Sequence, residues 1–168
     1  LQWMETMVCL AVPPRTLSKE QAQSIADSVP GVILFDTEKQ MLDAFLSLIE
    51  DADVLSGWNS EGYDIPYTIN RIIQVMGKAE TRRLCLWDQF PRERNYEAFG
   101  RENQTYDLIG RVHLDYMQLY RNYNYEERHS YRLDFIGEME VGEKKVAYEG
   151  SLDRLYNHDF QRFLEYNI

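Results

Sequence analysis

The residues whose types could most clearly support binding or catalysis follow a short apolar stretch that ends at Leu55. Residues 55–67 read Leu-Ser-Gly-Trp-Asn-Ser-Glu-Gly-Tyr-Asp-Ile-Pro-Tyr, so an amide, a ring and a carboxylate follow one another at Asn59, Tyr63 and Asp64. Open α/β sheets bind ligands at the carboxyl ends of their strands, and carboxylate oxygens are good ligands for hard divalent cations. The segment therefore predicts a ligand site, with Asp64 as a candidate metal ligand.

Asp64 also has a purely structural interpretation. Apolar residues at helical spacing follow it from Ile69 to Met76, and Gly77 is typical of a helix end. An aspartate in front of such a helix can act as the N-cap and accept hydrogen bonds from free backbone amides. Position alone leaves capping and ligand binding open for Asp64. Asn59 has the alternative of a turn residue, and Tyr63 that of a half-buried ring.

The elements that would position this segment alternate between strand and helix patterns. Residues 6–12 and 32–35 are predicted strands, while Ser18–Gln21 and Thr37–Gln40 are predicted to cap the helices that follow them. The second of these helices is predicted to bury one stripe: Met41, Leu42, Phe45, Leu48 and Ile49. This β-α-β-α alternation predicts an α/β fold with helices packed on a sheet.

Residues 92–110 interrupt the alternation. Two polar-aromatic stretches flank residues 100–103 and predict a β-hairpin with a four-residue turn. Its arginines, Arg101 among them, and its aromatic rings are of the kind that pair with phosphates and stack on bases. Interspersed acidic residues cancel much of that charge, so a solvated hairpin without a binding role is the alternative.

From Arg111 onward the chain is predicted to be mostly helical. Helices are expected to begin near Asp115 and Ser130, followed by a strand-like segment at 144–148 and two helical stretches between residues 152 and 168. His113, His129 and His158 show no metal-ligand spacing and are interpreted as surface or hydrogen-bonded histidines.

Composition restricts the class of protein. The chain of 168 residues fits one domain, and its 44% hydrophobic content suits a packed core. Its net charge of −10 argues against a stand-alone nucleic-acid binder, because nonspecific binding to a polyanion requires a basic surface. No apolar run approaches the ~20 residues of a membrane span. Cys9 and Cys85 are interpreted as reduced, buried thiols of a cytosolic protein, and the ends of the chain suggest an excised fragment.

The string at residues 57–67 resembles the second exonuclease motif of family B DNA polymerases, as found in T-even-like bacteriophages. Residues 114–120, 130–136 and 166–168 resemble the same proteins in order and rough spacing. The resemblance implies a ribonuclease H-like 3′–5′ exonuclease fold, in which a mixed sheet is flanked by helices and carries an inserted β-hairpin at residues 92–110. Residues 1–168 would then form a single, truncated exonuclease domain.

The resemblance also implies a chemistry. Proofreading sites of this family hydrolyse the primer 3′ end with two Mg²⁺ or Mn²⁺ ions held by about four carboxylates. Asp64 matches one of these ligands and Tyr166 matches the tyrosine that orients the attacking water. Lys145 matches a lysine near the scissile phosphate, although a solvated strand lysine is the alternative. Asn59 and Tyr63 would seat the terminal nucleotide, and the hairpin with Arg101 would help to hold the unwound primer end.

The chain departs from the family pattern at both ends. No Asp-x-Glu strand precedes Asp64, because Asp36-Thr37-Glu38 lies at a predicted helix start, and the third motif opens at Tyr166 but stops two residues before its aspartate. We therefore expect an inactive fragment of a cytoplasmic DNA polymerase from a bacterium or a phage-infected cell. Its partners would be single-stranded DNA and the remaining polymerase domains, and the fragment would tend to self-associate. The alternative is a non-catalytic module on a degenerate exonuclease fold that binds single strands or a protein partner.

Overall fold

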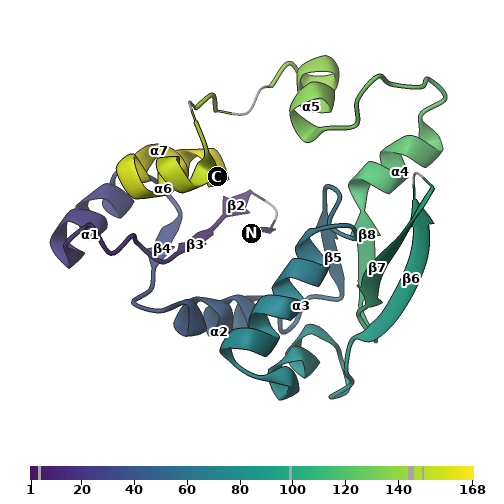
Figure 1. Cartoon of the computed structure of the whole chain (residues 1–168), viewed down its shortest axis with the longest axis horizontal. Helices are drawn as coiled ribbons and strands as arrows, with labels where there is room; N and C mark the ends of the chain where they lie inside the picture. The colour runs from purple at the N-terminus through teal and green to yellow at the C-terminus, as the bar shows by residue number, and fades with distance from the viewer. Residues whose placement is uncertain (4, 99, 144–145, 149) are drawn as a thin grey trace. The chain divides into compact units, whose positions relative to one another are not determined.

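The computed structural model describes residues 1–3, 5–98, 100–143, 146–148 and 150–168. The chain contains helices and small sheets, in agreement with the predicted α/β class. The chain divides into two compact units, residues 1–45 with 137–168 and residues 46–136. Figure 1 shows the course of the chain through both. Among the described residues, no helix has the length and apolar character that a membrane span requires.

The first unit centres on a parallel pair of short strands connected by a helix. Its elements are β1 (Gln2–Trp3), β2 (Thr6–Met7), β3 (Cys9–Ala11), α1 (Lys19–Asp27), β4 (Val32–Leu34), α6 (Leu152–His158) and α7 (Phe160–Asn167). β1 pairs antiparallel with β2, and β3 pairs parallel with β4. Two further helices, α2 (Glu38–Leu48) and α5 (Leu133–Val141), contribute residues to both units.

The core of the first unit forms where α7 packs on β3. The buried side chains come from both elements and from the turn after α1: Cys9, Ala11, Val29, Phe160 and Leu164. The ring of Tyr156 packs edge-on against Phe160, and its hydroxyl donates a hydrogen bond of 3.0 Å to the Val12 carbonyl. Burial of this apolar surface is the main term that stabilises the unit.

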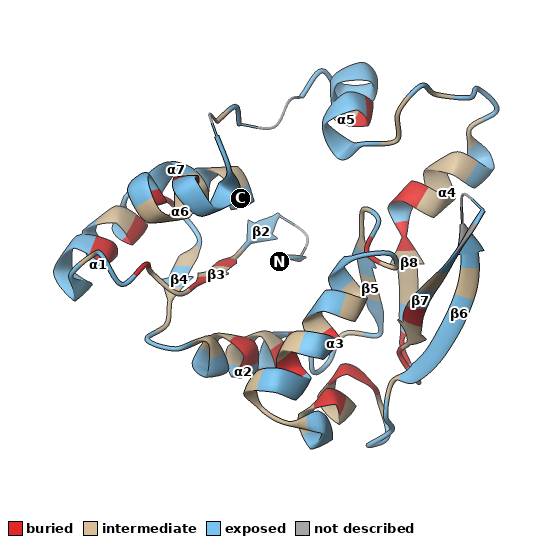
Figure 2. Cartoon of the chain, viewed as in Figure 1, coloured by how far each residue is buried: buried red, intermediate tan, exposed pale blue. Residues whose placement is uncertain are grey.

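The second unit contains one parallel and one antiparallel strand pair. Its elements are β5 (Val54–Gly57), α3 (Asp64–Val75), the 3₁₀ helix η1 (Lys78–Leu84), β6 (Arg92–Ala98), β7 (Arg101–Asp107), β8 (Val112–Asp115) and α4 (Tyr116–Tyr123). β5 pairs parallel with β8, and β6 pairs antiparallel with β7. Figure 1 shows the β6–β7 hairpin beside the β5–β8 pair. In Figure 2 β7 and β8 carry buried positions, whereas β6 is mostly exposed.

The predicted helix caps are confirmed at both positions. The Ser18 hydroxyl accepts from the Gln21 amide at 3.2 Å, and the Gln21 side chain accepts from the Ser18 amide at 3.0 Å. Thr37 and Gln40 form the same reciprocal pair at the start of α2. Each pair satisfies two backbone amides that the helix itself leaves without an acceptor. Cys9 and Cys85 are buried free thiols, as predicted.

The structure corrects several predicted strands. Residues 6–12 form the two short strands β2 and β3 instead of one, and residues 112–115 form β8 where a mostly helical chain was expected. Residues 146–148 are not a strand, while 144 and 145 lie outside the described residues. The described strands form four two-stranded sheets instead of one mixed sheet. Six of them have only two to four residues, which gives each few ladder hydrogen bonds.

The hairpin exists, but its predicted turn of four residues is wrong. Ala98 is paired with Arg101, so only residues 99 and 100 connect the two strands. Gly100 has a φ of +68°, a backbone conformation that glycine adopts without the clash of a Cβ atom. The two-residue connection with a left-handed glycine is the common form for tight hairpins.

Two predicted helix details are also wrong. On α2, Leu48 is 55% exposed and Leu46 is buried, so the buried stripe lies on a slightly different face from the predicted one. α5 begins at Leu133 and not at Ser130, and its buried residue is Ile136. A hydrophobic stripe at helical spacing shows which helix is amphipathic, but tertiary packing decides which of its members are covered.

Candidate functional site

The candidate site lies at the carboxyl ends of the parallel strands β5 and β8. Gly57, the last residue of β5, stands opposite Asp115, the last residue of β8. The chain then turns through residues 58–63, which we call the site loop, and enters α3 at Asp64. Parallel strand ends of this kind are the usual ligand position in α/β folds.

The site loop closes on its own backbone. Asn59 has a φ of +57°, a left-handed conformation that asparagine tolerates better than most residues. Its carbonyl accepts hydrogen bonds from the amides of Gly62 at 3.2 Å and Tyr63 at 3.1 Å. A Cβ atom on Gly62 would lie 2.9 Å from Asn59 Oδ1 and 3.2 Å from the Tyr96 hydroxyl, so a larger residue there would displace one or both side chains.

The buried carboxylate of Asp115 holds the site loop. Its Oδ1 accepts from the Asn59 amide and its Oδ2 from the Glu61 amide, each at 3.0 Å. Oδ1 also accepts from the Met117 amide at 3.0 Å, which makes Asp115 the N-cap of α4, as predicted. Three backbone amides therefore occupy a carboxylate that is only 6% exposed.

His113 lies two residues before Asp115 on β8 and also contacts the loop. Its Nε2 is 2.8 Å from the Ser60 hydroxyl, and Ser60 is buried. Burial lowers the pKa of His113, although the nearby carboxylates of Glu61 and Asp115 act in the opposite direction. The imidazole is therefore mainly neutral near pH 7, and the sequence interpretation of a hydrogen-bonded histidine applies to it.

Asp64 is the first residue of α3 and not its N-cap. Tyr63 occupies the cap position and makes no side-chain capping bond, so the capping interpretation of Asp64 is wrong. The Asp64 side chain faces solvent, yet desolvation by the surrounding protein raises its pKa, and the charge of Asp115 adds to that rise. A backbone hydrogen bond and His113 oppose it. A carboxylate in the first helical turn benefits from the helix dipole and remains accessible to a cation.

Tyr63 presents a larger surface than a half-buried ring. It is 62% exposed and stacks on Tyr67, with ring centroids 5.7 Å apart and planes within 10°. Tyr67 was not among the site residues predicted from the sequence, although the i, i+4 spacing of the two tyrosines across the start of a helix favours such a contact. Together they form an exposed aromatic surface beside Asp64, of the kind on which unpaired bases stack.

The β6–β7 hairpin supports the other side of the site loop. The buried hydroxyl of Thr105 donates to the Glu61 carbonyl at 2.7 Å, and Arg94 forms an ion pair with the Glu61 carboxylate. Arg94 also pairs with Asp107 at 2.9 Å. Arg101, a predicted substrate contact, is the first residue of β7, but its side chain lies outside the described part.

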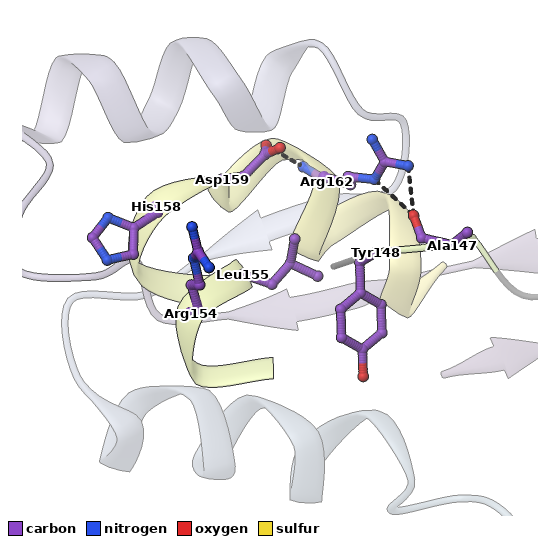
Figure 3. A pocket seen from close by; sticks show the side chains of 7 residues that line it. All are labelled: Ala147, Tyr148, Arg154, Leu155, His158, Asp159 and Arg162. Atoms are coloured by element: carbon purple, nitrogen blue, oxygen red, sulfur yellow. Dashed lines mark hydrogen bonds between the residues drawn. The ribbon is translucent and has the colours of Figure 1, made fainter. Parts of the chain in front are cut away.

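Tyr166, the predicted water-orienting residue, belongs to the first unit. It lies on α7, where its ring packs edge-on against Tyr148 with centroids 5.1 Å apart. Tyr148 also lines a pocket with Ala147, Arg154, Leu155, His158, Asp159 and Arg162 (Figure 3). Arg162 donates to the Ala147 carbonyl, and Asp159 caps α7. Lys145, the predicted phosphate contact, lies outside the described residues.

The described residues do not by themselves form a two-metal site. Within the described ranges, no group of three or more His, Cys, Asp or Glu side chains is arranged to hold a metal ion. Asp115 is occupied by backbone amides, and Asp36 precedes α2 in an ion pair with Lys19 at 2.7 Å. Asp64 is thus a carboxylate that could serve as one ligand among several, and these residues alone do not fit the complete pair of ions.

Comparison with known proteins places this geometry in a family. Residues 6–136 match the model of the exonuclease domain of DNA polymerase family B. The chain is 33% identical over 151 residues to the DNA-directed DNA polymerase of Escherichia phage RB69 and 29% identical over 151 residues to that of Enterobacteria phage T4. Each match covers 84% of this chain and 17% of the phage protein. The DNA polymerase delta catalytic subunit of Drosophila melanogaster is 29% identical over 141 residues, or 77% of this chain and 12% of that subunit.

Proposed function

This chain belongs to the exonuclease domain family of family B DNA polymerases, and we propose that it carries 3′–5′ proofreading within such a polymerase. The substrate is the single-stranded 3′ end of a DNA primer, and the reaction is hydrolysis of its last phosphodiester bond. The observation that carries the proposal is the arrangement of Asp64 beside the exposed Tyr63–Tyr67 pair at the carboxyl ends of β5 and β8. The proposed setting is the cytoplasm of a bacterium or a phage-infected cell, and the two phage relatives support it.

Each site residue has a role in this proposal. Asn59 and Tyr63 seat the terminal nucleotide, Asp64 binds a metal ion, and Tyr166 orients the attacking water. Lys145 contacts the scissile phosphate, and the hairpin with Arg101 guides the unwound strand. The ribonuclease H-like arrangement of the whole domain is part of the proposal, and the α/β elements and the strand pair β5–β8 support it.

A divalent cation, Mg²⁺ or Mn²⁺, would supply the activation of water and the stabilisation of the leaving 3′ oxygen when bound. Among the described residues, Asp64 is the carboxylate that fits this role. Its raised pKa shows that the protein environment disfavours an unpaired charge there, which a bound cation would reverse. The proposal therefore requires further carboxylates beyond the set that the described residues bring together.

Substitution of Asp64 in the intact polymerase tests the proposal. Asp64→Ala should reduce Mg²⁺-dependent digestion of a single-stranded oligonucleotide from its 3′ end by more than about 100-fold, since loss even of an outer-shell partner costs about 10- to 100-fold. DNA synthesis on a paired primer should be preserved. Asp51→Ala, at an exposed aspartate before β5, is the matched control. Digestion by Asp64→Ala at the parental rate would show that Asp64 is not a metal ligand of a proofreading site.

A second candidate function is a non-catalytic module that binds single strands. The exposed tyrosine pair supports it independently of any metal. The same assay distinguishes the two functions: a parent polymerase that binds the oligonucleotide but digests none of it, with or without Mn²⁺, favours the binding module. A parent polymerase that digests the oligonucleotide and loses this activity in Asp64→Ala favours proofreading.

A further inference from the structure

The site loop contains a residue in an unfavourable backbone conformation, which contacts with the rest of the unit help to maintain. Asn59 is held in the left-handed region, and the loop reverses the chain within the six residues between β5 and α3. Left-handed backbone is unfavourable for a residue with a Cβ atom unless surrounding contacts maintain it. Asn59 and Tyr63, the residues proposed to seat the nucleotide, both belong to this loop.

The contacts that maintain the loop come from one face of β8. His113 and Asp115 are two residues apart, so both side chains point to the same side of the strand. Asp115 accepts from the amides of Asn59 and Glu61, and His113 contacts the hydroxyl of Ser60. Three consecutive loop residues are therefore bound by two side chains of a neighbouring strand.

The register of the two strands explains why these contacts can form. β5 leads into the loop and β8 runs parallel to it, with Gly57 opposite Asp115 and Leu55 opposite His113. The strand that delivers the loop and the strand that binds it are thus fixed to each other by a hydrogen-bond ladder. A Cβ atom at Gly57 would lie 2.9 Å from the Ser60 Cβ, so the loop folds back closely over the end of β5.

The loop is coupled directly to the first turn of α3. The Ile65 amide donates to the Ser60 carbonyl at 2.9 Å, and the Tyr63 amide donates to the Asn59 carbonyl at 3.1 Å. A displacement of Asn59 or Ser60 therefore moves the residues on both sides of Asp64. The carboxylate of Asp115 forms charge-assisted hydrogen bonds in a buried setting, where such bonds are strongest.

We propose that Asp115 and His113 are positioning residues of the exonuclease site. They hold the site loop in the conformation that orients Asn59, Tyr63 and Asp64 toward the primer end. This inference rests on the proposed function for its catalytic part only. This role requires no contact of either side chain with the substrate, because both bind the loop itself. Asp115 fixes the loop backbone through two amides and joins it to the N-terminus of α4, while His113 fixes the buried Ser60 hydroxyl.

The structural part can be tested without any activity, by amide hydrogen exchange in the 168-residue chain. Asp115→Asn keeps the size of the side chain but leaves a single acceptor oxygen, so exchange at Asn59 and Glu61 should accelerate about ten- to a hundredfold. Exchange in β3 and β4 should not change. Ser18→Ala, which removes the cap of another helix, should leave exchange in the site loop unaltered and is the matched control. Unchanged exchange at Asn59 and Glu61 in Asp115→Asn would overturn the proposal.

The catalytic part is tested in the intact polymerase by 3′ digestion of a single-stranded oligonucleotide. Asp115→Asn should lower kcat about 10- to 100-fold with little change in KM, as expected for a supporting residue. His113→Leu should behave in the same way, whereas His113→Gln, which keeps a polar atom for Ser60, should recover most of the activity. If Asp115→Asn does not fold, the two His113 variants still test the proposal.

The outcomes separate the two proposals. A parent polymerase without digestion contradicts the proofreading function, while the exchange measurement still decides whether the two residues hold the loop. An active parent in which Asp115→Asn accelerates loop exchange but leaves kcat unchanged overturns the positioning role. Equal loss of activity in His113→Leu and His113→Gln overturns the role of His113.

Discussion

At the residue scale, the candidate site consists of exposed side chains on the site loop and on α3, and of side chains that hold the site loop in place. Tyr63 and Tyr67 are 62% and 55% exposed and lie face to face, so both rings are accessible to a ligand. Asp115, in contrast, is buried and fully engaged with backbone amides. In the proposed function, the tyrosines would contact the substrate and Asp115 would support the loop.

The tyrosine pair leads to a prediction about substrate affinity. Tyr67→Ala in the intact polymerase should raise the KM for a single-stranded 3′ end, since each base–aromatic stack contributes about 1–3 kcal/mol, or roughly 5- to 150-fold. The kcat should change less, because Asp64 and the loop backbone remain in place. Tyr123→Ala, at an exposed tyrosine at the end of α4, is the control. An unchanged KM in Tyr67→Ala would show that the stacked pair does not bind the substrate.

Much of this residue-scale picture was predictable from the sequence, and the rest was not, for identifiable reasons. The string at residues 57–67 predicted the chain reversal between β5 and α3, because glycine, asparagine and proline signal backbone reversals locally. The support from Asp115 and His113 was not predictable, because it depends on the pairing of β5 with a strand more than fifty residues later. Asp64 was a candidate N-cap, but it is the first residue of α3, because capping patterns do not locate the start of a helix to within one residue.

At the element scale, the end of α2 is joined to the start of β8 by one buried arginine. The guanidinium of Arg111 donates to the carbonyls of Ile49 at 2.6 Å, Glu50 at 2.8 Å and Ala52. These carbonyls follow the last turn of α2, where the helix itself provides no donors. Arg111 is only 8% exposed, so it replaces water as the partner of three acceptors.

Removal of this arginine should destabilise the second unit strongly. Arg111→Met removes a charged donor from three carbonyls, of which that of Ile49 keeps the Ala52 amide at 3.0 Å. We expect a loss of about 2–4 kcal/mol in the free energy of unfolding, as for buried hydrogen bonds to a charged group. Urea denaturation followed by far-UV circular dichroism measures this loss. Arg132→Met, at an exposed arginine, should change stability by less than about 0.5 kcal/mol. Similar midpoints for the two variants would contradict the role of Arg111.

The hairpin has an electrostatic support whose pH dependence can be derived. Hydrogen bonds from Arg92 and Arg94 lower the pKa of Asp107 in the folded chain. Because the folded pKa lies below the unfolded value of about 3.9, the stabilisation is complete above that value and is lost as the pH falls through the folded pKa. Both arginines are partly exposed, so the contribution is about 1 kcal/mol or less.

Asp107→Asn provides the measurement for this pH dependence. As the pH falls below about 4, opening of the β6–β7 hairpin in the parent chain should become easier, and this trend should be weaker in Asp107→Asn. Amide exchange at Thr105 and Tyr106, which belong to the paired part of β7, reports the opening. An identical pH trend in the parent and the variant would exclude Asp107 as the group responsible.

At the scale of the whole molecule, local patterns predicted the order of elements better than their association. Capping boxes and apolar runs determine where a helix or strand forms, and most of those predictions are confirmed. One mixed sheet was predicted, whereas each described strand pair lies within one unit: β1–β2 and β3–β4 in the first, β5–β8 and β6–β7 in the second. Long-range pairing has no local signature in a single sequence, and therefore the division into units could not be predicted.

The two buried cysteines report separately on the two units, because Cys9 lies in the first and Cys85 in the second. Burial raises the pKa of both thiols, so neither should react with an alkylating reagent at pH 8 before its unit opens. Since each unit has its own strand pairs, we expect the two cysteines to become reactive at different urea concentrations. Pulsed labelling of the unaltered chain, with the sites resolved by mass spectrometry, measures both midpoints together. Coincident midpoints would show instead that the units unfold as one cooperative domain.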